Sequence, residues 1–96
     1  MTGSRLSSDG LDARRKRLLF RCWHRGTREL DLIVGRFADT YLPTLSDAEL
    51  SQLEIILDVA DPELYAALIG EGPVPVGAAG SVFDKMKSFP VADHDA

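Results

Sequence analysis

The sequence predicts an all-α protein, a small antiparallel bundle of four to five helices. Apolar residues recur at helical spacing in several segments. Glycine, proline and helix-capping residues separate these segments at short intervals, and short connections favour antiparallel neighbours. No alternating pattern typical of a strand continues for more than a few residues. With 96 residues, the chain is long enough for one small domain and too short for two.

The ends of the chain differ in pattern from its middle. Residues 1–8 are polar and lack apolar periodicity, so we expect a disordered N-terminus. The helical bundle domain is predicted over residues 9–89, and residues 90–96 are expected to form a disordered C-terminal tail.

The first predicted helix starts at a cap formed by Ser8 or Asp9 and runs to about His24. Its apolar stripe includes Cys22, and Trp23 lies beside the stripe, where we expect it to pack in the core or at the helix junction. The remaining surface of this helix is largely basic, through Arg14, Arg15, Lys16, Arg17 and Arg21.

The second helix is predicted from Arg28 to about Tyr41, after a turn at Gly26 and a cap at Thr27. It has the clearest pattern in the chain, because apolar residues recur along one face over its whole length. Those residues are Leu30, Ile33, Val34, Phe37, Ala38 and Tyr41. Glu29 falls on a different face and can point to solvent.

The second half of the chain predicts three shorter segments. Ser46 and Glu49 form a capping box at the start of a third helix. Asp61 is predicted to cap a short fourth helix that ends at Gly70 or Gly72. Residues 72–80 are rich in glycine and proline and indicate a connector. Ser81 is a candidate cap for a last helix, which would be marginal unless it docks onto the bundle.

The turn between the first two helices carries residues that are better suited to display than to packing. Arg25 and Gly26 precede the second helix, and Arg28, Glu29 and Asp31 follow at its start. A carboxylate in the first turn is favoured by the helix dipole, whereas an arginine there is mildly unfavourable. Two interpretations remain open from these residues alone: a binding site displayed by a rigid helix start, or ordinary surface ion pairs.

The stretch Arg25-Gly26-Thr27-Arg28-Glu29 resembles the Arg-Gly-x-x-Glu motif of the succinate dehydrogenase assembly factors, the small flavinator proteins called SdhE in bacteria. The resemblance extends from about Leu18 to Gly70. Further residues at the family's spacing are Leu18-Leu19-Phe20, Phe37, Tyr41, residues 45–50 and Asp61-Pro62-Glu63-Leu64-Tyr65. Ala67 departs from the family, whose members commonly have tryptophan there, so any contact made by that ring is missing.

The resemblance implies a chaperone-like protein that is not itself an enzyme. Such proteins bind the flavoprotein subunit of succinate dehydrogenase, and in some bacteria that of fumarate reductase, and promote covalent attachment of FAD to a histidine of that subunit. By this resemblance Arg25, Gly26 and Glu29 are partner-binding residues, and Arg28 and Asp31 match adjacent positions. No cofactor is expected to bind the chain stably, because it would act on the FAD of its partner.

The distribution of charge along the chain bears on two alternative functions. The net charge is −4, with eight cations against two acids up to Arg28 and three cations against thirteen acids after it. The basic first helix therefore leaves a nucleic-acid-binding module open as an alternative, alongside an adaptor for another protein surface. Because the whole chain is acidic, we favour a solvated helix face and expect no nucleic-acid partner.

Other classes of function find no support in the sequence. There is no arrangement of residues typical of a catalytic site, and one cysteine with two distant histidines does not predict a metal site. No apolar run is long enough to insert into a membrane, and no signal peptide is evident. We expect a cytoplasmic protein of bacterial type, and a processed mitochondrial form remains the alternative.

Overall fold

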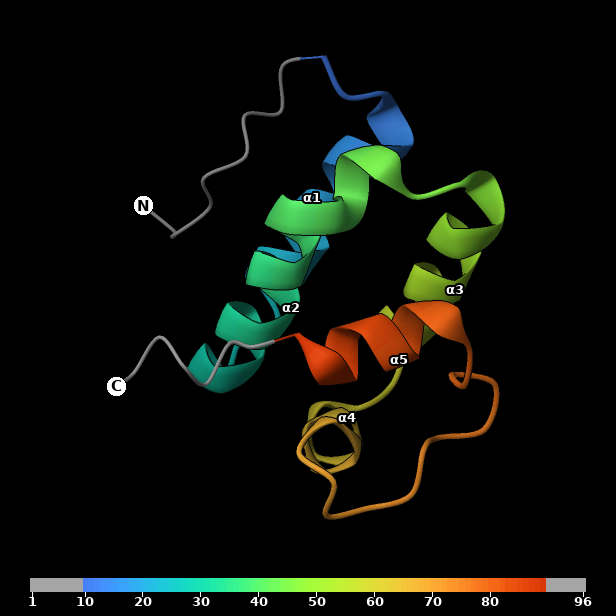
Figure 1. Ribbon diagram of the computed structural model, residues 1–96. Coiled ribbons are helices and arrows are strands. Elements are labelled where there is room, and N and C mark those ends of the chain that lie inside the picture. Colours follow the sequence, from blue (N-terminus) through green and yellow to red (C-terminus); the bar gives the residue numbers. More distant parts are fainter. Residues whose placement is uncertain (1–9, 90–96) are drawn as a thin grey trace.

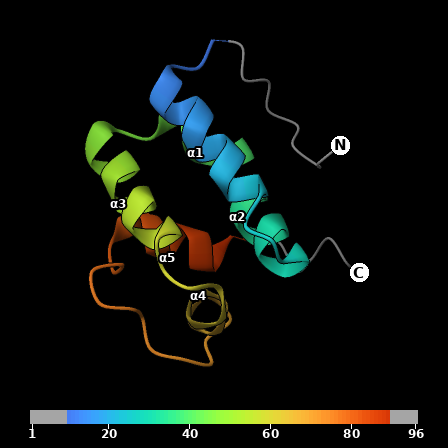
Figure 2. The same ribbon diagram turned by 180° about the vertical axis from the view of Figure 1, so that it is seen from behind.

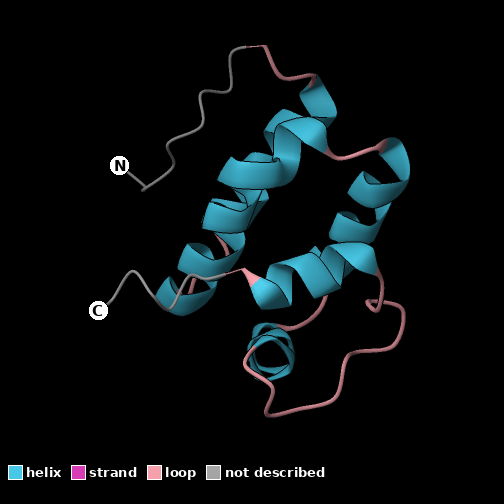
Figure 3. Ribbon diagram, viewed as in Figure 1, coloured by secondary structure: helices cyan, strands magenta, loops and turns pink. Residues whose placement is uncertain are grey.

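The computed structural model describes residues 10–89, and this part of the chain contains five α-helices, one 3₁₀ turn and no strand (Figure 1, Figure 3). The elements are α1 (Ala13–Trp23), α2 (Arg28–Tyr41), the 3₁₀ turn η1 (Leu42–Thr44), α3 (Asp47–Leu57), α4 (Asp61–Leu68) and α5 (Ser81–Ser88). The predicted all-α bundle is confirmed. The predictions of disordered ends at 1–8 and 90–96, and of a cap at Ser8 or Asp9, lie outside the described residues.

Helices α1 and α2 form an antiparallel pair that lies side by side in both views of the molecule (Figure 1, Figure 2). Helix α5 packs against both α3 and α2, and α4 contacts α2. Both views look along the axis of α4, so this helix lies across the α1–α2 pair instead of running parallel to it. The start of α4 lies near the turn that joins α1 to α2, because Asp61 of α4 bonds to Arg25 of the turn.

One continuous hydrophobic core holds the helices together. The predicted apolar face of α2 is confirmed, with Leu30, Val34, Phe37 and Ala38 buried. Helix α5 also contributes its apolar side, so the last helix docks onto the bundle. The buried side chains of the other helices are Leu18, Leu19, Cys22, Trp23, Leu50, Leu53, Ile56, Leu57, Leu64, Ala67, Leu68, Val82, Phe83 and Met86.

The contact between α1 and α2 depends on a glycine whose role the apolar pattern did not reveal. A Cβ atom added to Gly35 would lie 2.4 Å from Cδ2 of Trp23, so the indole ring rests directly on the backbone of α2. The indole Nε1 donates a hydrogen bond to Oδ1 of Asp39, at 3.1 Å. The expected packing role of Trp23 is confirmed.

The helix starts confirm some predicted caps and correct others. The capping box is present, with the N–H of Glu49 donating to Ser46 Oγ at 3.2 Å and the N–H of Ser46 donating to Glu49 Oε1 at 2.8 Å. Thr27 stands at the N-cap of α2, but its side chain makes no capping bond. The first helix starts later than predicted, at Ala13 after an N-cap at Asp12.

Two predicted caps are wrong, and a residue distant in sequence explains each case. The N-cap of α4 is Ala60, while the Asp61 carboxylate bonds instead to Arg25. The N-cap of α5 is Gly80 in place of Ser81. The amide of Val82 is satisfied by Gln52 of α3, whose Oε1 accepts a hydrogen bond at 3.1 Å.

The end of α4 shows which of the two candidate glycines closes it. Gly70 has φ +83°, a left-handed conformation that a residue without a Cβ adopts readily. The amide of Gly70 bonds to the carbonyl of Ala67 at 3.3 Å, and the amide of Glu71 bonds to that of Ala66 at 2.8 Å. This pair of bonds is a Schellman motif, which satisfies carbonyls left open at the helix end.

Candidate functional site

The turn between α1 and α2 is built around Gly26. Its φ is +103°, so an L side chain at this position would be strained. No atom lies within 4 Å of where a Cβ would stand, and the residue is exposed. The backbone at Gly26 is therefore open to close approach by another molecule, and a larger residue would both strain the turn and obstruct that approach.

Arg25 points into the protein. Its side chain is only 8% exposed, and its guanidinium donates from every nitrogen to an internal acceptor. Nε bonds to Oδ1 of Asp61 at 3.0 Å, Nη1 to the carbonyl of Leu57 at 2.7 Å and Nη2 to the carbonyl of Val59 at 2.7 Å. Arg25 thus joins the turn before α2 to the link between α3 and α4.

Asp31 is also engaged within the fold. Its Oδ1 accepts a hydrogen bond from the backbone N–H of Arg25 at 2.8 Å. The half-buried carboxylate spans the turn from the first helical turn of α2 and fixes the backbone at Arg25. Of the five predicted site residues, Arg25 and Asp31 therefore form the internal frame of the turn.

Arg28 and Glu29 lie in the first turn of α2 and are exposed. Among residues 10–89, neither side chain makes a hydrogen bond or an ion pair. The next residue, Leu30, is 1% exposed and anchors the helix start in the core. The structure therefore presents one cation and one anion to solvent from a rigid element, close to the open backbone of Gly26.

A depression of about 300 Å³ lies beside these residues, between the starts of α2 and α4. Side chains from both helices line it: Thr27, Glu29, Leu30, Asp61, Pro62 and Tyr65. The α4 residues were absent from the predicted site. The family spacing of residues 61–65 is the sequence signal that points to them, but the sequence analysis assigns Asp61 to a helix cap.

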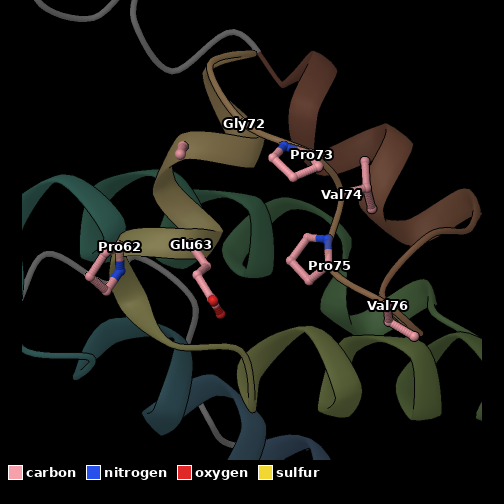
Figure 4. Close-up of a pocket in the computed structure, with 8 residues that line it drawn as sticks. Pro62, Glu63, Gly72, Pro73, Val74, Pro75 and Val76 are labelled. Carbon is pink, nitrogen blue, oxygen red and sulfur yellow. The ribbon is translucent and has the colours of Figure 1, made fainter.

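A larger depression of about 650 Å³ shares Pro62 with the first. The loop after α4 forms one wall and α4 forms the other (Figure 4). The lining residues are Pro62, Glu63, Ala66, Gly72, Pro73, Val74, Pro75 and Val76. This surface is mainly apolar, and Val76 is fully exposed.

The basic residues of α1 are largely bound to other parts of the chain. Arg14 bonds to Glu54 at 2.9 Å, and Arg21 bonds to Asp58 at 2.9 Å. Arg15 pairs with Asp12 and also donates to the carbonyls of Leu42 and Leu45. The charge difference between the two halves of the sequence is therefore partly neutralised where α1 meets α3.

The hydrogen bonds from Arg14 hold the pKa of Glu54 below its usual value of 4.5. Burial has the opposite effect on Cys22, where it raises the thiol pKa to about 12.

Among residues 10–89 there is no group of three or more histidine, cysteine, aspartate or glutamate side chains placed to hold a metal. No helix in the same range is long and apolar enough to cross a membrane.

A profile of the family described as flavinator of succinate dehydrogenase matches residues 16–90. This match includes the turn, the frame around Arg25 and the start of α4. The chain belongs to this family. The expectation drawn from the Arg-Gly-x-x-Glu motif is thereby confirmed at the level of the family.

Curated relatives agree with this assignment. The chain is 40% identical over 85 residues to the FAD assembly factor SdhE of Acetobacter pasteurianus, covering 88% of this chain and 78% of the relative. It is 32% identical over 85 residues to the mitochondrial succinate dehydrogenase assembly factor 2 of Danio rerio, covering 86% of this chain and 54% of that relative. The chain therefore spans about half the length of the zebrafish relative. No solved structure matches the chain.

Proposed function

We propose that this protein is an assembly factor that binds the flavoprotein subunit of succinate dehydrogenase and promotes covalent attachment of FAD to it. The observation that carries this function is the exposed pair Arg28 and Glu29 beside the open Gly26 backbone, in a chain of the flavinator family. The flavoprotein subunit of fumarate reductase is a second client, to be tested in parallel.

The exposed charges favour recognition of a protein surface. Arg28 and Glu29 have no internal partner among the described residues, so a partner can form charge-assisted hydrogen bonds without breaking existing ones. Both project from a helix start whose next residue is buried, so little order is lost on binding. Gly26 allows the partner to approach the turn closely.

The assembly factor itself performs no chemical step in this mechanism. It binds best to the flavoprotein conformation that holds the target histidine close to the flavin methyl carbon, and so increases the population of that conformation. The subunit then forms the covalent bond with its own groups, at a rate raised by proximity and orientation. The histidine nitrogen and the flavin methyl carbon each lose one hydrogen as the bond forms, and the two electrons and two protons released leave the flavin in its reduced form. Differential affinity for two client conformations is all that the factor has to supply.

FAD is expected to stay with the client and not to bind this chain stably. Carboxylates of Glu29 and Asp61 line the depression beside the motif, and negative charge there disfavours a dinucleotide pyrophosphate. This negative charge supports a protein partner in preference to a bound flavin.

Covalent flavin fluorescence in a denaturing gel tests the function directly. The succinate dehydrogenase flavoprotein subunit is expressed with this protein, without it, and with Glu29→Ala. Asp84→Ala is the matched control, because Asp84 is also an exposed acid in the first turn of a helix. We expect strong signal with the intact protein and the control, and weak signal in the other two samples.

Equal signal in all samples would contradict the assembly role. Recovery of a different polypeptide in a pull-down from untagged cell extract would then favour an adaptor. The nucleic-acid alternative predicts retention of duplex DNA that falls steeply with added salt. The internal ion pairs of Arg14 and Arg21 favour weak retention even at low salt.

A further inference from the structure

We propose that Arg25, the first residue of the motif, is a positioning residue that builds the client-binding surface from inside and does not itself contact the client. This inference rests on the proposed function. It extends the client surface to the start of α4, through Pro62 and Tyr65, and gives the two charged ends of the motif different roles.

The geometry of Arg25 carries the inference. The side chain is 8% exposed, and Nε, Nη1 and Nη2 all donate to internal acceptors, so the guanidinium is held inside the fold and has little to offer a client. The side chain of its acid partner Asp61 is 28% exposed, so the protein shields most of this ion pair from solvent. By contrast, Arg28 is exposed and without an internal partner in the described range.

The acceptors of Arg25 show what the residue holds in place. Leu57 is the last residue of α3, where carbonyl groups have no partner within the helix. Arg25 satisfies that carbonyl and the carbonyl of Val59 in the link, while Asp61 is the first residue of α4. One planar guanidinium therefore fixes the end of α3, the link and the start of α4 relative to the motif turn.

The depression beside the motif depends on this arrangement. One wall comes from the start of α2, including Glu29, and the other comes from the start of α4, including Pro62 and Tyr65. The α4 wall comes from residues near the start of this helix, so the separation of the two walls is set where α4 begins. The clamp between Arg25 and Asp61 lies at that point, so loosening it moves one half of the surface relative to the other.

Binding of the purified succinate dehydrogenase flavoprotein subunit to the full chain tests the inference by calorimetry. The variants are Asp61→Asn, Arg25→Lys and the double variant, with Glu29→Ala as the contact variant. Asp58→Asn is the matched control, because Asp58 lies on the same link and pairs with Arg21 at an exposed site. All are measured below the melting temperature of the least stable variant.

We expect Asp61→Asn and Arg25→Lys each to raise the Kd about tenfold, with the double variant no worse than the single ones, since both changes break one unit. Asp58→Asn should leave the Kd unchanged. Binding stoichiometry separates positioning from a loss of fold, because unfolded protein lowers the stoichiometry whereas a misplaced α4 raises the Kd.

Wild-type affinity of Asp61→Asn together with weak binding by Arg25→Lys would overturn the inference, because Arg25 would then contact the client directly. An absence of binding by the wild-type chain would instead refute the proposed function.

Arginine modification by phenylglyoxal gives a second test that needs no variant. Arg25 should be protected in the free protein and in the complex, whereas Arg28 should react in the free protein and become protected in the complex. Reaction of Arg25 in the folded free chain, with protection only by the client, would overturn the inference.

Discussion

Replacement of Gly35 by alanine tests the packing of α1 on α2 most directly. A Cβ at this position would lie 2.4 Å from Cδ2, 2.5 Å from Cε2 and 2.8 Å from Cε3 of Trp23. These distances are too short for carbon atoms in contact, so the indole ring has to move outwards. That movement also strains the hydrogen bond from the indole Nε1 to Asp39, which is 3.1 Å long.

The magnitude follows from three terms. Overpacking a core costs about 1–3 kcal/mol. Loss of the indole hydrogen bond adds about 1 kcal/mol. Alanine is the better helix former, and this offsets about 1 kcal/mol. We therefore expect Gly35→Ala to lower the free energy of unfolding by about 2 kcal/mol, and the melting temperature by about 8–16 °C.

Urea and thermal unfolding, followed by circular dichroism, measure this change. Fluorescence of the single tryptophan reports on the indole environment in the same samples. In a Trp23→Leu background the clash is absent, so Gly35→Ala should stabilise the chain by up to about 1 kcal/mol. A neutral or stabilising effect of Gly35→Ala in the wild-type chain would refute the described packing of the ring on the α2 backbone.

Three further predictions concern single side chains. Gln52→Ala removes the acceptor for the Val82 amide and should cost about 1 kcal/mol, with faster hydrogen exchange in α5; unchanged exchange there would contradict it. The Cys22 thiol has its pKa raised to about 12 by burial, so a thiol reagent at neutral pH should react only as fast as the chain unfolds, and rapid labelling of the native protein would count against this. The pKa of Glu54 is lowered chiefly by Arg14, so its ionised form stabilises the fold at neutral pH, and this contribution is lost as the pH falls below 4.5 through the lowered pKa. Glu54→Gln should therefore show a smaller loss of melting temperature between neutral and acidic pH, and an identical loss would exclude the linkage.

The helices and the core are the parts of this protein that the sequence alone predicts well. The apolar face of α2 and the capping box at Ser46 and Glu49 depend on residues within a few positions of one another. Such local terms act in any arrangement of the bundle, so periodicity and capping chemistry identify them without a tertiary structure. The motif at residues 25–29 can likewise be recognised from the sequence alone.

Capping residues were predicted wrongly where a distant side chain competes for the same group. Asp61 was predicted as a cap, yet its carboxylate bonds to Arg25, 36 positions away. The start of α5 is satisfied by Gln52, 30 positions from Val82, and Ser81 is not the cap. Local sequence describes what a side chain can do, but it does not contain the positions of competing partners.

Only the tertiary structure decides which arginine of the motif is buried and which is exposed. Arg25 and Arg28 stand on either side of the turn at Gly26. Nothing in their residue type or spacing distinguishes a buried guanidinium from an exposed one. The difference arises because α3 ends, and α4 begins, against Arg25, where two carbonyls and a carboxylate require donors. Arg28 makes no contact of this kind within the described residues and is exposed, as is Glu29.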